Sequence, residues 1–140
     1  MGHTASAPQP DVASWTPSVL TEYEIGRAIQ AAETIARSEK PVAEVGCQKV
    51  ASTVALEDDL RECVNLAGHA DNVRVWTRAT DGGRVRYGFY REDWALNALN
   101  FLDRADISDV DRAWISGLLF GYRGDAIQQF ISRTRRPTTT

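Results

Sequence analysis

The stretch VRVWTRATDGGRVRYGFYR, residues 73–91, decides the fold. Apolar and polar side chains alternate on both sides of a DGG turn at residues 81–83, and this period of two is typical of a β-hairpin. One face of the predicted hairpin is apolar and consists of Val73, Val75, Val85, Tyr87 and Phe89. The other face is basic around one aromatic residue and consists of Arg74, Trp76, Arg78, Arg84 and Arg86.

Helical patterns precede the hairpin. Thr21 and Glu24 have the spacing of a capping box, and the apolar residues after them recur at helical intervals, which predicts a helix over about residues 22–38. A shorter helix is predicted over residues 58–67. Residues 42–56 allow two interpretations, because their apolar spacing suits a helix and their β-branched content suits a strand. We favour the helix.

Three further helices are predicted after the hairpin. Two acidic residues, Glu92 and Asp93, begin the first of them, where they suit the positive end of the helix dipole. Ser108 caps the second helix and Asp125 caps the third, with Gly121 in the turn between them. The predicted inner stripe of the second helix consists of Val110, Ala113, Trp114, Gly117 and Leu118. The apolar residues of the other two helices are Trp94, Ala95, Ala98, Leu99, Phe101 and Leu102, and then Ile127, Phe130 and Ile131.

Together these patterns predict an α+β fold, a mostly helical single domain with one β-hairpin at about residues 73–91 and a C-terminal helix pair. A domain over residues 19–133 suits a chain of 140 residues. Residues 1–18 are rich in proline and small polar residues, and they predict a disordered tail in which Trp15 alone folds back as an anchor. Residues 134–140 predict a flexible basic tail.

The amino-acid composition limits the kind of protein that this chain can be. The formal net charge is −3, with 43% hydrophobic and 25% charged residues, which is the balance of a soluble globular protein. The apolar runs are too short to span a membrane, so no membrane contact is predicted. Cys47 and Cys63 lack C-x-x-C spacing, and we expect two reduced thiols in a cytoplasmic protein.

No catalytic constellation stands out in the sequence. Cys47 and His69 could pair as nucleophile and base, but no local signature surrounds either residue. The two cysteines with His69 and Asp71 would form an irregular ligand set for zinc. We therefore predict a protein that is not an enzyme and that uses no cofactor and no metal.

The segment GLLFGYRGDAIQQFI, residues 117–131, is similar to helix-turn-helix modules over about residues 111–133. Gly117, Gly121 and Ile127 occupy the small, turn and apolar positions of that motif, with Tyr122 and Phe130 at the other packing positions. In this interpretation Asp125, Gln128 and Gln129 would face the major groove of DNA, where a glutamine can bind adenine. The residues near phosphates would be Arg133, Arg135 and Arg136. A plain pair of antiparallel helices explains the same glycines, and we favour it.

The same stretch, GLLFGY followed by Ala126 and Ile127, resembles segments of small uncharacterised proteins from phages and mobile elements of GC-rich bacteria. The resemblance covers the C-terminal third of the chain and implies the role of a small modulator. It assigns no functional residue.

Two functional hypotheses follow. The first is a non-catalytic regulator that acts through protein–protein interaction. Its predicted partner-binding residues are Arg74, Trp76, Arg78, Arg84, Arg86 and Tyr90. Exposed tryptophan, tyrosine and arginine are enriched at interfaces, and the arginines predict an anionic macromolecular partner, protein rather than DNA. The alternative is a DNA-binding regulator with the hairpin as a wing, against which the sequence pI of 5.4 argues. The arginines could also be a solvated face that prevents edge-to-edge aggregation.

Overall fold

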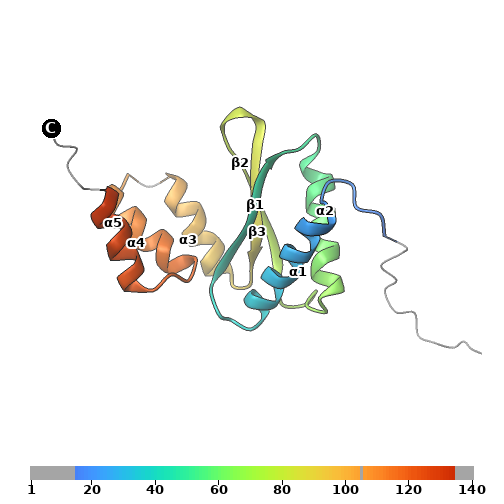
Figure 1. The fold of residues 1–140 in the computed structure, drawn as a ribbon, viewed down its shortest axis with the longest axis horizontal. Coiled ribbons are helices and arrows are strands. Elements are labelled where there is room, and N and C mark those ends of the chain that lie inside the picture. The colour runs from blue at the N-terminus through green and yellow to red at the C-terminus, as the bar shows by residue number, and fades with distance from the viewer. Residues whose placement is uncertain (1–14, 105, 135–140) are drawn as a thin grey trace, which may run out of the picture.

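A three-stranded antiparallel sheet stands at the centre of the molecule, with two helices on one side and three on the other (Figure 1). The computed structural model describes residues 15–104 and 106–134. The elements in chain order are α1 (Glu22–Ala36), β1 (Val42–Lys49), α2 (Thr53–Leu66), β2 (Arg74–Ala79), the short 3-10 turn η3 (Asp81–Gly83), β3 (Arg84–Tyr90), α3 (Asp93–Arg104), α4 (Asp109–Leu119) and α5 (Gly124–Thr134). The predicted α+β fold with a hairpin and a C-terminal helix pair is confirmed.

The hairpin is formed by β2 and β3, which pair from Arg74 opposite Tyr90 to Ala79 opposite Val85. The turn between the strands needs backbone angles that side chains with a Cβ rarely adopt. Gly82 has a φ of 78° and Gly83 a φ of 75°, and glycine reaches this left-handed region without a steric penalty.

The preferred helix for residues 42–56 is wrong over its first half, because Val42–Lys49 form strand β1. This strand pairs antiparallel with β3, so the strand order is β1-β3-β2 and β3 lies in the middle. A shift in register between Glu44 and Gly46 marks a β-bulge. The partners of β1 lie in β3, far along the chain, and no local pattern in the sequence reveals this pairing. Helix α2 begins at Thr53, five residues earlier than predicted.

One face of the sheet packs on α1 and α2 and forms the first hydrophobic core. The buried side chains of the hairpin in this core are Val73, Val85, Tyr87 and Phe89, with Val75 packed against them. The helices contribute Ala28, Ala32, Ile35, Leu56, Leu60, Cys63 and Val64. The predicted apolar face of the hairpin is therefore confirmed.

The segment directly before α1 packs on the domain, ahead of the predicted domain start at residue 19. Trp15 packs against the first core, as the anchor hypothesis predicted. The carboxylate of Asp59, only 2% exposed, accepts hydrogen bonds from the backbone N–H groups of Ser18, Val19 and Leu20 at 2.7–3.1 Å. A buried carboxylate requires such partners, so this residue of α2 ties the N-terminal segment to the domain. The rest of the predicted tail, residues 1–14, lies outside the described residues, as do residues 135–140 of the predicted C-terminal tail.

The other face of the sheet is covered by α3, and α4 and α5 follow outward in succession (Figure 1). The second core lies here and consists of Val42, Trp76, Tyr90, Ala95, Leu99, Leu102 and Leu119. The apolar face of α3 is narrower than predicted, because Trp94 and Phe101 are 57% and 46% exposed. No helix in the described part of the chain has both the length and the apolar character needed to cross a membrane.

The predicted inner stripe of α4 is wrong at Leu118, which is 56% exposed, whereas Leu119 is 4% exposed. Ile115 and Leu119 face the second core, and Gly117 faces α5. Since α4 packs between two helices, it buries two narrow stripes instead of the single wide one that the sequence pattern suggested.

Two neighbouring leucines test this register. Replacing Leu119 by alanine should lower the free energy of unfolding by about 2–5 kcal/mol, because it removes a buried side chain from the second core. The same change at Leu118 should cost no more than about 0.5 kcal/mol, since that side chain lies in solvent. Urea unfolding of both variants measures the difference, and equal costs would show that the register of α4 is wrong.

Candidate functional site

The predicted arginine face of the hairpin is not an open surface. Trp76 is 3% exposed and Tyr90 is 8% exposed, so the expectation that both side chains are exposed is wrong. The alternation along β2 was correctly interpreted, and it does separate two faces. Helix α3 covers the part of this face around Trp76 and Tyr90, so each face of the sheet contributes to a hydrophobic core.

Trp76 lies across the middle strand of the sheet. It is paired with Gly88 of β3, and its indole Nε1–H donates a hydrogen bond of 3.2 Å to the carbonyl of Ala43 on the far strand β1. Gly88 has no room for a side chain, because an added Cβ would lie 1.8 Å from that same carbonyl oxygen. The indole therefore covers a glycine and joins all three strands.

Arg78 connects this tryptophan to α3. Its guanidinium carbon lies 5.9 Å from the centre of the Trp76 ring, and its Nε lies 2.8 Å from a carboxylate oxygen of Asp103. It also donates hydrogen bonds to the side chain of Asn100 and, at 3.4 Å, to the carbonyl of Leu99. With 16% of its side chain exposed, Arg78 is part of the packing between sheet and helix.

The other arginines of this face also have partners within the fold. Arg86 lies 5.9 Å from the Trp76 ring and forms a bidentate pair with Glu44 at 2.5–3.2 Å, a hydrogen-bonded contact that raises the pKa of the arginine. Arg74 lies 2.8 Å from Asp93, and Arg84 donates to the carbonyl of Cys47. Carboxylates from β1 and α3 thus offset most of the positive charge, which gives the cluster a structural explanation.

A comparison of two arginines tests this explanation. Arg78→Met should lower the free energy of unfolding by about 1–3 kcal/mol, because it removes charge-assisted hydrogen bonds to α3. Arg84→Met removes an exposed contact and should cost no more than about 0.5 kcal/mol. Denaturant unfolding measures both values. If Arg78→Met leaves the free energy of unfolding unchanged, the packing does not depend on Arg78, and this residue stays a candidate for partner binding.

Cys47 and His69, the possible nucleophile and base, have different neighbours in the fold. Nε2 of His69 lies 3.0 Å from a carboxylate oxygen of Glu33 on α1. Cys47 lies on β1 opposite Arg86, and Cys63 is buried in the first core. Both cysteines are free thiols, as the sequence predicted.

The cysteines should differ sharply in reactivity. Burial, together with the charges of Asp59 and Glu62, raises the pKa of Cys63 to about 12, because both effects disfavour the thiolate. At pH 8 a thiol reagent should therefore label the half-buried Cys47 first and should reach Cys63 only after unfolding. Mass spectrometry of timed alkylation measures this order. Equal rates in the folded protein would contradict the burial of Cys63.

The segment with helix-turn-helix similarity does form two helices joined by a short turn. Gly121 in the turn has a φ of 82°, and an added Cβ at Gly117 would lie 2.6 Å from the side chain of Ile127, so both glycines are required. Ser108 caps α4 as predicted, by accepting a hydrogen bond from the N–H of Asp111. Helix α5 begins at Gly124, so Asp125 lies in its first turn and is not the capping residue before it.

Two of the expected packing positions are not buried. Tyr122 is 64% exposed and Phe130 is 57% exposed, whereas the motif would bury both. Gln128, Gln129 and Arg133 lie exposed on α5, as the alternative hypothesis requires. Arg135 and Arg136 lie outside the described residues.

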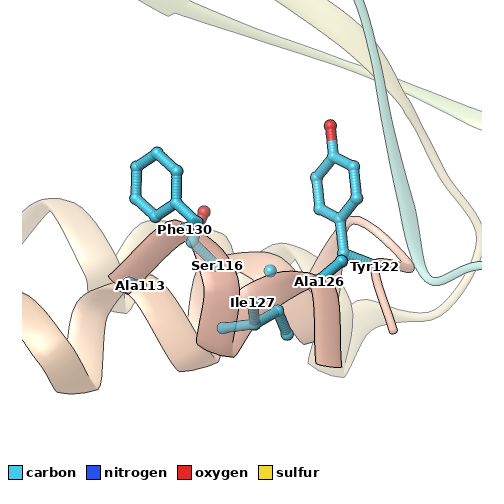
Figure 2. Close-up of a pocket in the computed structure, with 7 residues that line it drawn as sticks. Ala113, Ser116, Tyr122, Ala126, Ile127 and Phe130 are labelled. Atoms are coloured by element: carbon cyan, nitrogen blue, oxygen red, sulfur yellow. The ribbon is translucent and has the colours of Figure 1, made fainter. Parts of the chain in front are cut away.

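The exposed aromatic residues border a hollow between α4 and α5. Its volume is about 410 Å³ and its lining is mostly apolar: Ala113, Ser116, Gly117, Tyr122, Ala126, Ile127 and Phe130. The ring of Phe130 on α5 and the ring of Tyr122 in the turn between α4 and α5 point to the same side, with a gap between them (Figure 2). We call this hollow the aromatic groove. Because its lining is mostly apolar, the groove could accommodate apolar groups.

Sequence reasoning missed the groove because it assigned Tyr122 and Phe130 to internal packing. Apolar residues at helical spacing predict a packing stripe, but they do not show whether another element covers it. Helix α5 has four apolar side chains among eleven residues, a number that is typical of a packed surface helix and does not indicate an exposed groove.

Comparisons with protein-family models, curated proteins and solved structures found no match to this chain. The resemblance to phage and mobile-element proteins accordingly stays a prediction.

Proposed function

We propose that this protein is a non-catalytic binding protein that acts through protein–protein interaction, with the aromatic groove between α4 and α5 as its contact site. The observation that carries the proposal is the exposure of Tyr122 and Phe130 beside an apolar hollow. Aromatic side chains at the edge of an apolar pocket are typical of the residues that dominate binding energy at protein interfaces.

The groove supports the proposal better than the arginine face does. Trp76 and Tyr90 are buried, and Arg74, Arg78 and Arg86 each have a carboxylate partner within the fold. A partner at that face would have to replace these contacts, whereas a partner at the groove would cover apolar surface that now meets water.

The size of the groove also suits a peptide segment. A hollow of about 410 Å³ falls within the range of well-formed ligand sites. Its floor is formed by small and aliphatic residues, among them Gly117 and Ile127, so one or two apolar side chains of a partner can enter between the aromatic rings.

A DNA-binding function is the second candidate, favoured by the exposure of Gln128, Gln129 and Arg133 on α5. Against it, the chain as a whole is acidic, with a formal net charge of −3 and a pI of 5.4, whereas DNA-binding domains are typically strongly basic. The free thiols of Cys47 and Cys63 support the cytoplasm as the place of action.

A substitution that places a polar side chain in the groove tests the proposal. The whole chain is used to select peptides from a random library displayed on phage, and the best peptide is synthesised for fluorescence polarisation. Ala126→Gln adds an uncharged amide to the lining of the groove, and an amide without partners in an apolar contact costs about 1–3 kcal/mol. Binding should therefore weaken about tenfold or more.

The matched control is Ser132→Gln, which places the same side chain at an exposed position of α5 outside the lining. This variant should bind like the unaltered protein. The proposal is wrong if no peptide is selected, or if both variants bind equally well. Tight binding of duplex DNA at low salt that is lost in Gln129→Ala would favour the DNA-binding function instead.

A further inference from the structure

We propose that the aromatic groove continues into a positively charged cleft, and that the site as a whole selects a peptide segment with an acidic residue beside its apolar anchor. This inference rests on the proposed function and names the chemistry of the partner. Its basis is a second cavity that adjoins the groove.

The second cavity has a volume of about 480 Å³ and lies where α1, β1 and α4 meet. We call it the cationic cleft. Ser116 and Tyr122 line both the groove and the cleft, so these two residues form a shared wall. A segment that places an apolar side chain in the groove would therefore extend over Tyr122 into the cleft.

The charges that line the cleft are Arg27, Lys40, Arg86 and Glu44. Arg86 and Glu44 satisfy each other through the bidentate contact described above. Arg27 lies over the ring of Tyr23 at 5.9 Å, and among the described residues neither Arg27 nor Lys40 has a carboxylate within ion-pair distance. Two positive charges thus remain for a partner.

Lys40 is held against the helix pair that forms the groove. An added Cβ at Gly121 would lie 2.7 Å from Cβ of Lys40 and 3.2 Å from its Cδ, so the lysine stem packs on the turn between α4 and α5. Tyr122 is the next residue of that turn. A lysine stem that packs on apolar surface while its ammonium group reaches water is a favourable arrangement, and here it positions the charge beside the groove.

A peptide fits these features better than a nucleic acid does. The small and aliphatic floor of the groove suits a side chain such as leucine, and two separate cations suit one or two carboxylates. A nucleic acid would bring a continuous row of phosphates to a protein whose formal net charge is −3. The partner is therefore an acidic, apolar peptide segment.

The two lysines of the chain provide a matched test. Lys40→Met retains the stem that packs on Gly121 and removes the charge, while Lys49→Met makes the same change at an exposed position that does not line the cleft. The probe is the best peptide from the phage selection, in its selected form and with each Asp or Glu changed to Asn or Gln.

We expect the selected peptides to carry an acidic residue near their apolar anchor. Lys40→Met should weaken binding of the acidic form about two- to fivefold at low ionic strength, a typical value for an exposed ion pair. The difference should shrink as salt is added. Lys49→Met should bind like the unaltered protein, and the amide form of the peptide should not distinguish Lys40→Met from it.

Other outcomes separate the two proposals. If peptides bind in the groove but show no acidic preference and no response to Lys40→Met, the inference is overturned and the proposed function stands. If no peptide depends on Ala126, both are overturned. Binding of oligo-deoxythymidine that is weakened by Ala126→Gln and by Lys40→Met would also overturn the inference, because the site would then take a single-stranded nucleic acid.

Discussion

The indole of Trp76 is the interaction on which the arrangement of the two halves depends. It crosses β3 over Gly88, donates its N–H to the carbonyl of Ala43 and faces α3 with its outer side. A larger residue at Gly88 would collide with the backbone of Ala43, whose carbonyl accepts this hydrogen bond, and a side chain without the indole N–H would leave that carbonyl with one partner fewer. Arg78, stacked near this ring and paired with Asp103, extends the same contact to α3.

The position of the candidate site follows from this layered packing. Helix α3 packs on the sheet, α4 packs on α3 and α5 packs on α4, so each helix is farther from the sheet than the one before it (Figure 1). The outermost pair has no further layer among the described residues, and its apolar side chains border a hollow that no other element fills. Most arginines of the hairpin pair with carboxylates within the fold, whereas the aromatic groove is apolar surface that stays exposed.

Local signals in the sequence were sufficient for much of the fold. The capping residues Thr21 and Ser108 begin helices where the spacing indicated, because a cap depends on residues only three apart. Strand β1 was missed since its backbone partners lie in β3, about forty residues later. The sequence allowed only part of the candidate site to be predicted. The close packing of Gly117 on Ile127 follows from the helix-turn-helix similarity, but the exposure of Tyr122 and Phe130 depends on which elements cover α5.

The sequence by itself determined the hairpin, the first core and the division of β2 and β3 into two chemically distinct faces, because strand geometry places alternate residues on opposite sides. Only the tertiary structure decided that each face would contribute to a hydrophobic core. Alternation separates Arg78 and Trp76 from Val75 and Thr77, yet it contains no information about a helix that begins fifteen residues after Arg78 and returns to cover them. Two arginines that were predicted to form a binding surface are instead part of the packing. Arg78 pairs with Asp103 of α3, and Arg86 pairs with Glu44 of β1.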